Sequence, residues 1–240
     1  MGIDIFGRQY SIYVPADGRN LKTWWDFEDF IENTTATTMG IWTSSYTGTG
    51  ASVTDVAVED IKRIGKLRLD SGTTTTGRAG IFLARVSYSK FLFGAGIYTL
   101  EADIYIPTLS DGTDTYTLRF GFGDGSGTPT DGAYFRYTDT GTTPNWYRCT
   151  VSNTTLTATD TAVAVVAGAW IRLKVVVNAD GTSVEYFING TSVGSNTTNI
   201  PTGTGRETTG LCNLVKSAGT TARTVDIDWT WIHIDLSTSR

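Results

Sequence analysis

Two carboxylates, Glu101 and Asp103, form the strongest pair of candidate catalytic residues in the sequence. They lie two positions apart in a segment where apolar and polar residues alternate, so both should point to the same face of a strand. Hydrolysis of a glycosidic bond uses two carboxyl groups about 5 to 10 Å apart, and this spacing could provide them. A solvated strand face explains the same pattern more simply, and it is the interpretation we prefer.

Aromatic residues could serve a second kind of chemistry, the stacking of rings on sugars. Trp24, Trp42 and Trp146 are the candidates, with Tyr46 and Tyr137 as further options. Most tryptophans in a β-sandwich belong to the core, so we expect only one or two of these rings to be exposed.

The composition excludes several classes of partner. The 240 residues carry a formal net charge of −5 without any basic run, so we expect no nucleic acid as a partner. No stretch of 18 apolar residues is available to span a membrane. The first residues have no apolar signal segment, so the protein is expected to stay where it is made or to leave inside a particle. The two cysteines, Cys149 and Cys212, are expected to be small buried hydrophobic residues rather than a disulfide framework.

Period-two alternation with turn residues between segments predicts an all-β chain of ten or more short strands. We expect one domain over residues 23–240 preceded by an arm over residues 1–22. The predicted strands are Thr23–Ile31, Lys66–Asp70, Ile81–Tyr88, Ile97–Ile106, Thr115–Phe122, Ala133–Thr138, Trp146–Val151, Trp170–Val177, Thr182–Ile188, Leu211–Val215 and Thr224–Ile234, with a Thr/Gly/Ser loop at Thr34–Thr54.

The arm contains apolar side chains that share no single periodicity. Such side chains favour burial against a surface, so the arm is expected to dock on another subunit or on a scaffold. The docking residues would be Ile3, Ile5, Phe6, Tyr10, Ile12 and Tyr13.

The hairpin region is the most specific part of the chain. Trp170–Val177 is followed by Asp180-Gly181, then by Val184–Ile188 and Asn189-Gly190. Asp-Gly and Asn-Gly supply the positive-φ pairs that two-residue hairpin turns require. This arrangement resembles the central hairpin of the concanavalin A-like lectin/glucanase (laminin-G-like) superfamily. Trp25-Asp26-Phe27-Glu28 and Val225-Asp226-Ile227-Asp228-Trp229 resemble the first and last strands of such domains.

The resemblance, over roughly residues 23–236, implies a two-sheet antiparallel concanavalin-like jelly-roll sandwich with the terminal strands side by side. Glucanases of this fold carry a third carboxylate after a pair such as Glu101 and Asp103, but Tyr105 or Ile106 stands there. Lyases of the fold need a His and a Tyr, or an Arg-rich strand, to neutralise a uronate and abstract a proton. Here His233 has nothing comparable around it, and Arg119 and Arg136 are isolated in the sequence. We therefore expect no enzyme.

The resemblance also implies a structural calcium ion where the first and last strands meet, since calcium takes hard oxygen ligands. Glu28 (or Asp26) and Asp228 (or Asp226) stand at the matching places; against this, they are ordinary polar strand residues. No other cofactor is expected.

Two hypotheses follow. The first is a non-enzymatic structural protein of a virus particle, such as a bacteriophage capsid decoration or tail component, located in the virion and bound to other virion proteins and to copies of itself. The superfamily that this chain resembles includes non-catalytic jelly rolls of virus particles. The second is a carbohydrate-binding module or lectin that binds surface glycans outside the cell or on a host cell surface. A glycan-degrading enzyme is third.

Overall fold

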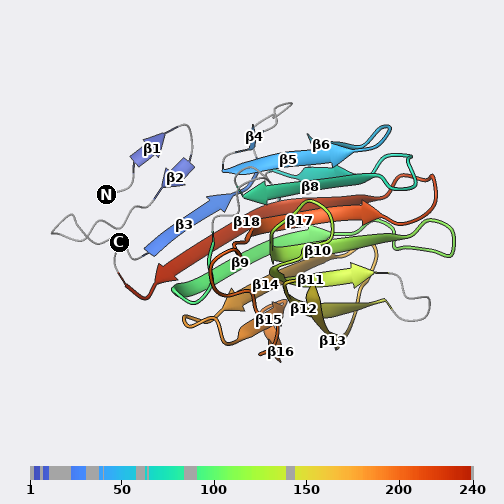
Figure 1. The fold of residues 1–240 in the computed structure, drawn as a ribbon. Coiled ribbons are helices and arrows are strands. Elements are labelled where there is room, and N and C mark those ends of the chain that lie inside the picture. The colour runs from blue at the N-terminus through green and yellow to red at the C-terminus, as the bar shows by residue number, and fades with distance from the viewer. Residues whose placement is uncertain are drawn as a thin grey trace.

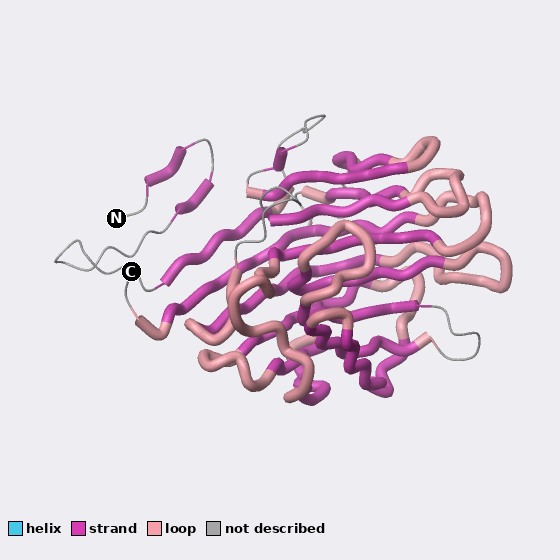
Figure 2. Tube along the Cα trace, viewed as in Figure 1, coloured by secondary structure: helices cyan, strands magenta, loops and turns pink. Residues whose placement is uncertain are grey.

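The computed structural model describes residues 3–5, 8–10, 23–30, 38–39, 41–57, 63, 65–83, 91–138 and 144–238. These residues form strands joined by turns and loops, as Figure 2 shows. None of them forms a helix long and apolar enough to cross a membrane. The strands are β1 (Ile3–Ile5), β2 (Arg8–Tyr10), β3 (Thr23–Glu28), β4 (Thr38–Met39), β5 (Trp42–Thr47), β6 (Ser52–Asp55), β7 (Leu67–Asp70), β8 (Arg78–Leu83), β9 (Gly96–Tyr105), β10 (Tyr116–Gly123), β11 (Gly132–Thr138), β12 (Asn145–Ser152), β13 (Thr155–Ala164), β14 (Trp170–Val177), β15 (Val184–Ile188), β16 (Thr191–Asn196), β17 (Thr209–Lys216) and β18 (Thr224–Leu236).

Two antiparallel sheets pack face to face (Figure 1). The β10 sheet has the order β13-β12-β11-β10-β17-β8-β5-β4. The β9 sheet has the order β16-β15-β14-β9-β18-β7-β6, and β3 also pairs with β18. The all-β, two-sheet architecture predicted from the alternation is therefore confirmed.

Alternation along β9 and β10 builds the core between the sheets. Leu100, Ala102 and Ile104 of β9 are fully buried there. Leu118 and Phe120 of β10 face them from the other sheet. Side chains at odd positions of β9 therefore point to the outer face of the β9 sheet, and this is where Glu101 and Asp103 lie.

The predicted hairpin is present, but its two turns differ. Asn189 (φ 50°) and Gly190 (φ 79°) both have positive φ, as expected for the tight turn between β15 and β16. Asp180 and Gly181 instead sit within the longer loop between Val177 and Val184, so the prediction of a two-residue turn there was wrong.

The first and last strands of the sandwich are adjacent, as predicted, with Phe27 opposite Trp231 and Trp25 opposite His233. Cys149 and Cys212 are both buried and free, as expected.

Several strands were not predicted. β5 and β6 lie in the segment Thr34–Thr54 that was expected to be a loop, and β13 and β16 were missed. Their Thr- and Ser-rich sequences have few apolar residues to mark a buried face. β13 alternates between intermediate and exposed residues only.

The arm contributes a separate two-stranded sheet in which Ile3 lies opposite Tyr10 and Ile5 opposite Arg8. Neither strand joins the two large sheets (Figure 1). Phe6, Ile12 and Tyr13 lie outside the described residues. Docking through the arm stays a prediction.

Candidate functional site

A β-bulge in β18 sets the geometry of the site. Ile227 pairs with Ile104 of β9, but the next pair joins Thr230 to Ala102, so β18 has one extra residue at this point. A bulge bends the strand and re-aims side chains. As a result, Asp228 and Trp229 both reach partners on the outer face of the β9 sheet.

Charged groups from three strands and from the segment that holds Arg63 meet on this face. The Asp103 Oδ1 atom accepts a hydrogen bond from Arg172 Nε at 3.0 Å, and its Oδ2 atom accepts one from Arg63 Nη1 at 3.5 Å. Arg63 also donates to Asp228, while Arg172 lies 3.9 Å from Glu101. The two guanidinium groups therefore link three carboxylates into one network.

Aromatic rings flank this network. The Arg63 guanidinium lies 3.8 Å from the centre of the Trp170 ring, and Tyr105 packs on the same tryptophan at 5.3 Å. Arg172 lies 5.1 Å from the Trp229 ring centre, and Phe27 stacks on Trp229 at 5.9 Å. Both arginines are thus held by a ring as well as by carboxylates.

Burial affects the charges of the network. Desolvation raises the pKa of Glu101, although Lys174 and Arg172 oppose the shift. Desolvation also raises the pKa of Asp228, against the influence of Arg63. The hydrogen bond to Asp103 raises the pKa of Arg172. Two of the carboxyl groups are therefore easier to protonate than in water.

A polar depression of about 280 Å³ opens at the network. Asn189 contributes one wall because its turn is tied to β14: Asn189 Oδ1 accepts from the Arg172 backbone N–H, and the Asn189 N–H donates to the Arg172 carbonyl. We call this hollow the polar depression; its lining residues are Arg63, Glu101, Asp103, Trp170, Arg172, Asn189 and Gly190.

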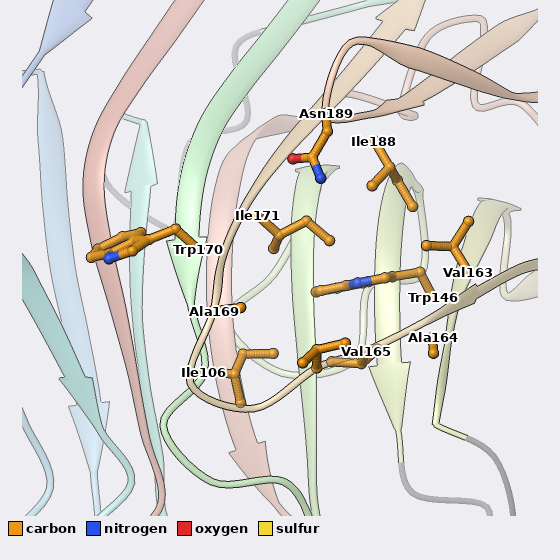
Figure 3. A pocket seen from close by; sticks show the side chains of 11 residues that line it. Ile106, Trp146, Val163, Ala164, Val165, Ala169, Trp170, Ile171, Ile188 and Asn189 are labelled. Carbon is orange, nitrogen blue, oxygen red and sulfur yellow. The ribbon is translucent and has the colours of Figure 1, made fainter.

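An apolar pocket of about 230 Å³ adjoins it and shares Trp170 and Asn189 with it. Figure 3 shows the Trp146 indole at the centre of this pocket, while the Trp170 ring points away from it. Ile106, Ile171 and Ile188 supply further apolar walls. Trp170 and Asn189 therefore separate an apolar compartment from a polar one.

The structure places the predicted glycosidase pair at this site, and the third carboxylate of the network is Asp228 of β18 rather than a residue of β9. Tyr105, at the position of the third carboxylate, stacks on Trp170, and Ile106 is buried. Glu101 and Asp103 do lie on the outer strand face, as expected, though their exposure is small because the arginines cover them.

The predicted sugar-binding tryptophans differ in how far they are exposed to solvent. Trp24 is 40% exposed, but Trp42 and Trp146 are 1% and 0% exposed, so neither presents a free ring face and the proposal for these two was wrong. They fill the core between the sheets. Of the further options, Tyr46 is exposed and Tyr137 is buried.

The proposed calcium ligands do not come together. Glu28 pairs with Thr230 on the core side of the sheet and accepts a hydrogen bond from the Phe30 N–H, whereas Asp228 turns to Arg63 on the outer face. The alternative ligand Asp226 is held by Arg68 and Lys66. In the described part of the chain, no three His, Cys, Asp or Glu side chains cluster in a way that could hold a metal. Calcium binding stays a prediction.

Sequence reasoning missed Arg63, Arg172, Trp170, Trp229 and Asn189 as site residues. Arg172 and Trp170 lie on a strand whose sequence was recognised, and its pairing with β9 would have identified both. Nothing in the sequence around Arg63 indicates that it lies next to Asp228 and Asp103.

Comparisons with known proteins agree with the fold. Residues 62–228 match the protein family described as SO2946-like, C-terminal domain. A protein of unknown function, SO2946 from Shewanella oneidensis MR-1, has a similar structure: the TM-score is 0.67 at 17% identity, over 91% of this chain and 89% of that one. No curated protein matches the sequence.

Other similar structures are lectins and glycan-degrading enzymes. Peanut lectin gives a TM-score of 0.58 at 9% identity, over 90% of this chain and 99% of that one. The β-glucanase of Bacillus licheniformis gives 0.53 at 16% identity, over 90% and 98%. The fold is therefore the concanavalin-like jelly-roll sandwich that the resemblance implied.

Proposed function

The chain belongs to the SO2946-like C-terminal domain family, and we propose that it is a carbohydrate-binding protein that holds a neutral glycan in the polar depression without cleaving it. The observation that carries the proposal is that Arg172 and Asp103, which are hydrogen-bonded to each other, line the same hollow as the Trp170 ring. A hydrogen-bonding network and an aromatic surface are thereby presented together beside an open hollow.

The residue types suit a sugar. Carboxylate oxygens and guanidinium N–H groups can bond to hydroxyls as acceptors and donors. The Trp170 ring, which lines the depression, can contact the apolar face of a pyranose. The similar structure of peanut lectin supports a glycan-related role.

Binding without cleavage is favoured by how the carboxylates are engaged. Asp103 accepts hydrogen bonds from two arginines, and Asp228 is paired with Arg63. A retaining mechanism needs one carboxyl group as acid and another as nucleophile. The similar structures include enzymes as well as lectins, so this part of the proposal requires a direct assay.

A glycan array followed by calorimetry with the best ligand tests the proposal. Trp170→Ala and Asp103→Asn should each weaken binding at least tenfold, which corresponds to about 1.4 kcal/mol. Tyr46→Ala is the matched control, since Tyr46 is an exposed ring outside the polar depression, and its affinity should equal that of the wild type. If no glycan on the array is bound, or if the affinity of Trp170→Ala equals that of the wild type, the site is rejected. Release of reducing ends from the bound glycan would reject the claim of no cleavage.

A second candidate function is the structural protein of a bacteriophage particle, with the arm docking on virion partners or on copies of the chain. It is favoured by the β1–β2 sheet, which pairs with neither large sheet. Deleting residues 1–20 should leave the melting temperature unchanged but reduce the mass measured by light scattering to that of a single chain. If the full chain is itself a monomer and does not bind particles, this candidate fails.

A further inference from the structure

Two arginines face each other on the outer face of the β10 sheet. Arg119 of β10 lies directly opposite Arg136 of β11, and the row continues to Asn213 on one side and Tyr147 on the other. Arg119 and Arg136 are isolated in the sequence, but strand pairing brings them together. Like charges directly opposite each other in a sheet destabilise the pairing.

These charges have no counterion among the described residues. Arg119 is only 7% exposed, and Nη2 donates to the neutral hydroxyl of Thr128 at 3.1 Å. Its Nε and Nη1 atoms have no hydrogen-bond partner, and neither has Arg136 Nε. In the described part of the chain, no carboxylate forms an ion pair with either arginine. A buried charge normally has such a partner, since desolvation without one is costly.

A matched arginine elsewhere in the fold shows the usual solution. Arg223 is 6% exposed, comparable to Arg119, but it lies 2.6 Å from Asp111 and 3.6 Å from Asp114. Arg223 Nε, like Arg119 Nε, has no hydrogen-bond partner, so the two side chains differ in the carboxylates that lie beside Arg223.

The neighbours of the two arginines can also hydrogen-bond to an anion. Tyr134 interacts with Arg119 through a side-chain hydrogen bond, and burial raises the pKa of Tyr134 to about 12, so its hydroxyl keeps its proton and can also donate. Arg136 lies 5.5 Å from the centre of the Tyr147 ring and is only half-buried, which gives access from solvent. Burial and Arg136 both lower the pKa of Arg119, an effect that a bound anion would oppose.

We propose that Arg119 and Arg136 form a binding site for an oxyanion, a carboxylate or a sulfate, that a ligand brings to the outer face of the β10 sheet. The anion would replace Thr128 as the acceptor for Arg119, and it would bridge the two guanidinium groups, whose planar forks suit such oxygens. This site lies on the opposite sheet from the polar depression, and it does not depend on the glycan-binding function.

Calorimetry with three probes tests the proposal: tri-galacturonate, inorganic sulfate and a neutral galactose trisaccharide. At least one charged probe should bind, with an affinity that falls as salt is raised, while the neutral trisaccharide should not bind here. Tighter binding of tri-galacturonate than of sulfate would assign the site to an acidic saccharide. Similar affinities for the two would assign it to a small oxyanion.

The variants separate binding from structure. Arg119→Met should lose binding at least tenfold, and its melting temperature without ligand should equal or exceed that of the wild type, because an unpaired buried charge is removed. Arg223→Met should do the reverse, with a lower melting temperature and unchanged anion affinity. If Arg119→Met does not fold, Arg136→Gln provides the binding test at a half-exposed position. The proposal is overturned if neither charged probe binds the wild type, or if Arg119→Met binds as the wild type does.

Discussion

Asp226 offers the sharpest test of how the sandwich is held together. Its side chain is fully buried, and it accepts two hydrogen bonds from Arg68, Nε at 2.7 Å and Nη2 at 2.8 Å. Lys66, itself buried, lies 3.3 Å away. Asp226→Asn keeps the size of the side chain but places an uncharged amide between two cations.

The magnitude follows from the burial of each partner. Removing one member of a buried ion pair costs about 3 to 5 kcal/mol, whereas an exposed pair contributes about 0 to 1 kcal/mol. The pair of Asp226 with Lys66 is buried and belongs to the first class. The pair with Arg68 lies between the two classes, because the Arg68 side chain is one-third exposed. We therefore expect a loss of about 3 kcal/mol, which for a domain of this size lowers the melting temperature by about 6 to 12 °C.

Equilibrium unfolding in urea measures this loss. The slope of the unfolding free energy against urea concentration should stay at the wild-type value. Glu185→Gln is the matched control: it removes one negative charge from an exposed position of the same sheet and should change stability by less than about 0.5 kcal/mol. If Asp226→Asn is as stable as this control, the buried ion pair contributes nothing and the reasoning fails.

Three further results are expected. Burial raises the pKa of Cys149 to about 11 and also raises that of Cys212, so neither thiol should react with a thiol reagent at neutral pH until the protein unfolds. Rapid labelling of the native protein would contradict this. The raised pKa of Glu101 means that the folded state holds a proton more tightly than the unfolded chain, so the free energy of unfolding should fall as the pH rises above about 4.5. Glu101→Gln should reduce that fall, and urea titrations across this range would measure it. If Glu28 and Asp228 hold calcium, chelation should lower the melting temperature, and identical curves with chelator and with calcium would remove that site.

The fold was predictable where burial alternates strictly. Segments such as Ile97–Ile106 and Thr115–Phe122 show large apolar residues at every second position, and both proved to be strands of the core. Strands at the sheet edges, such as β13 and β16, carry Thr, Ser and Gly instead. Their stability comes from backbone pairing with a neighbour, and single-chain periodicity does not record that pairing.

The candidate site was predictable only in part. Alternation placed Glu101 and Asp103 on one face, but the partners that define their chemistry come from distant segments. Arg63 is 40 positions from Asp103 and 165 from Asp228. Arg119 and Arg136 are likewise separated in the sequence. They lie opposite each other only because of the register in which β10 pairs with β11.

The bulge in β18 explains why alternation did not predict the aromatic residues of this strand beside the site. Before the bulge, Val225 and Ile227 face the core, whereas after it Ile232 and Ile234 do. The inward positions therefore change from odd to even within one strand. A single alternating pattern cannot describe both halves, and it would bury either Asp226 or Trp231 in the core. The extra residue keeps both on the outer face, where Asp226 meets Arg68 and Trp231 stacks on His233. Deleting Trp229 should therefore remove the extra residue and give an unbulged strand in which Ile227 and Ile232 still face the core. Such a variant should keep the sandwich and lose the contacts of Trp229 with Arg172 and Phe27. Circular dichroism and thermal unfolding measure whether the sandwich is kept, and a variant that does not fold would contradict this reasoning.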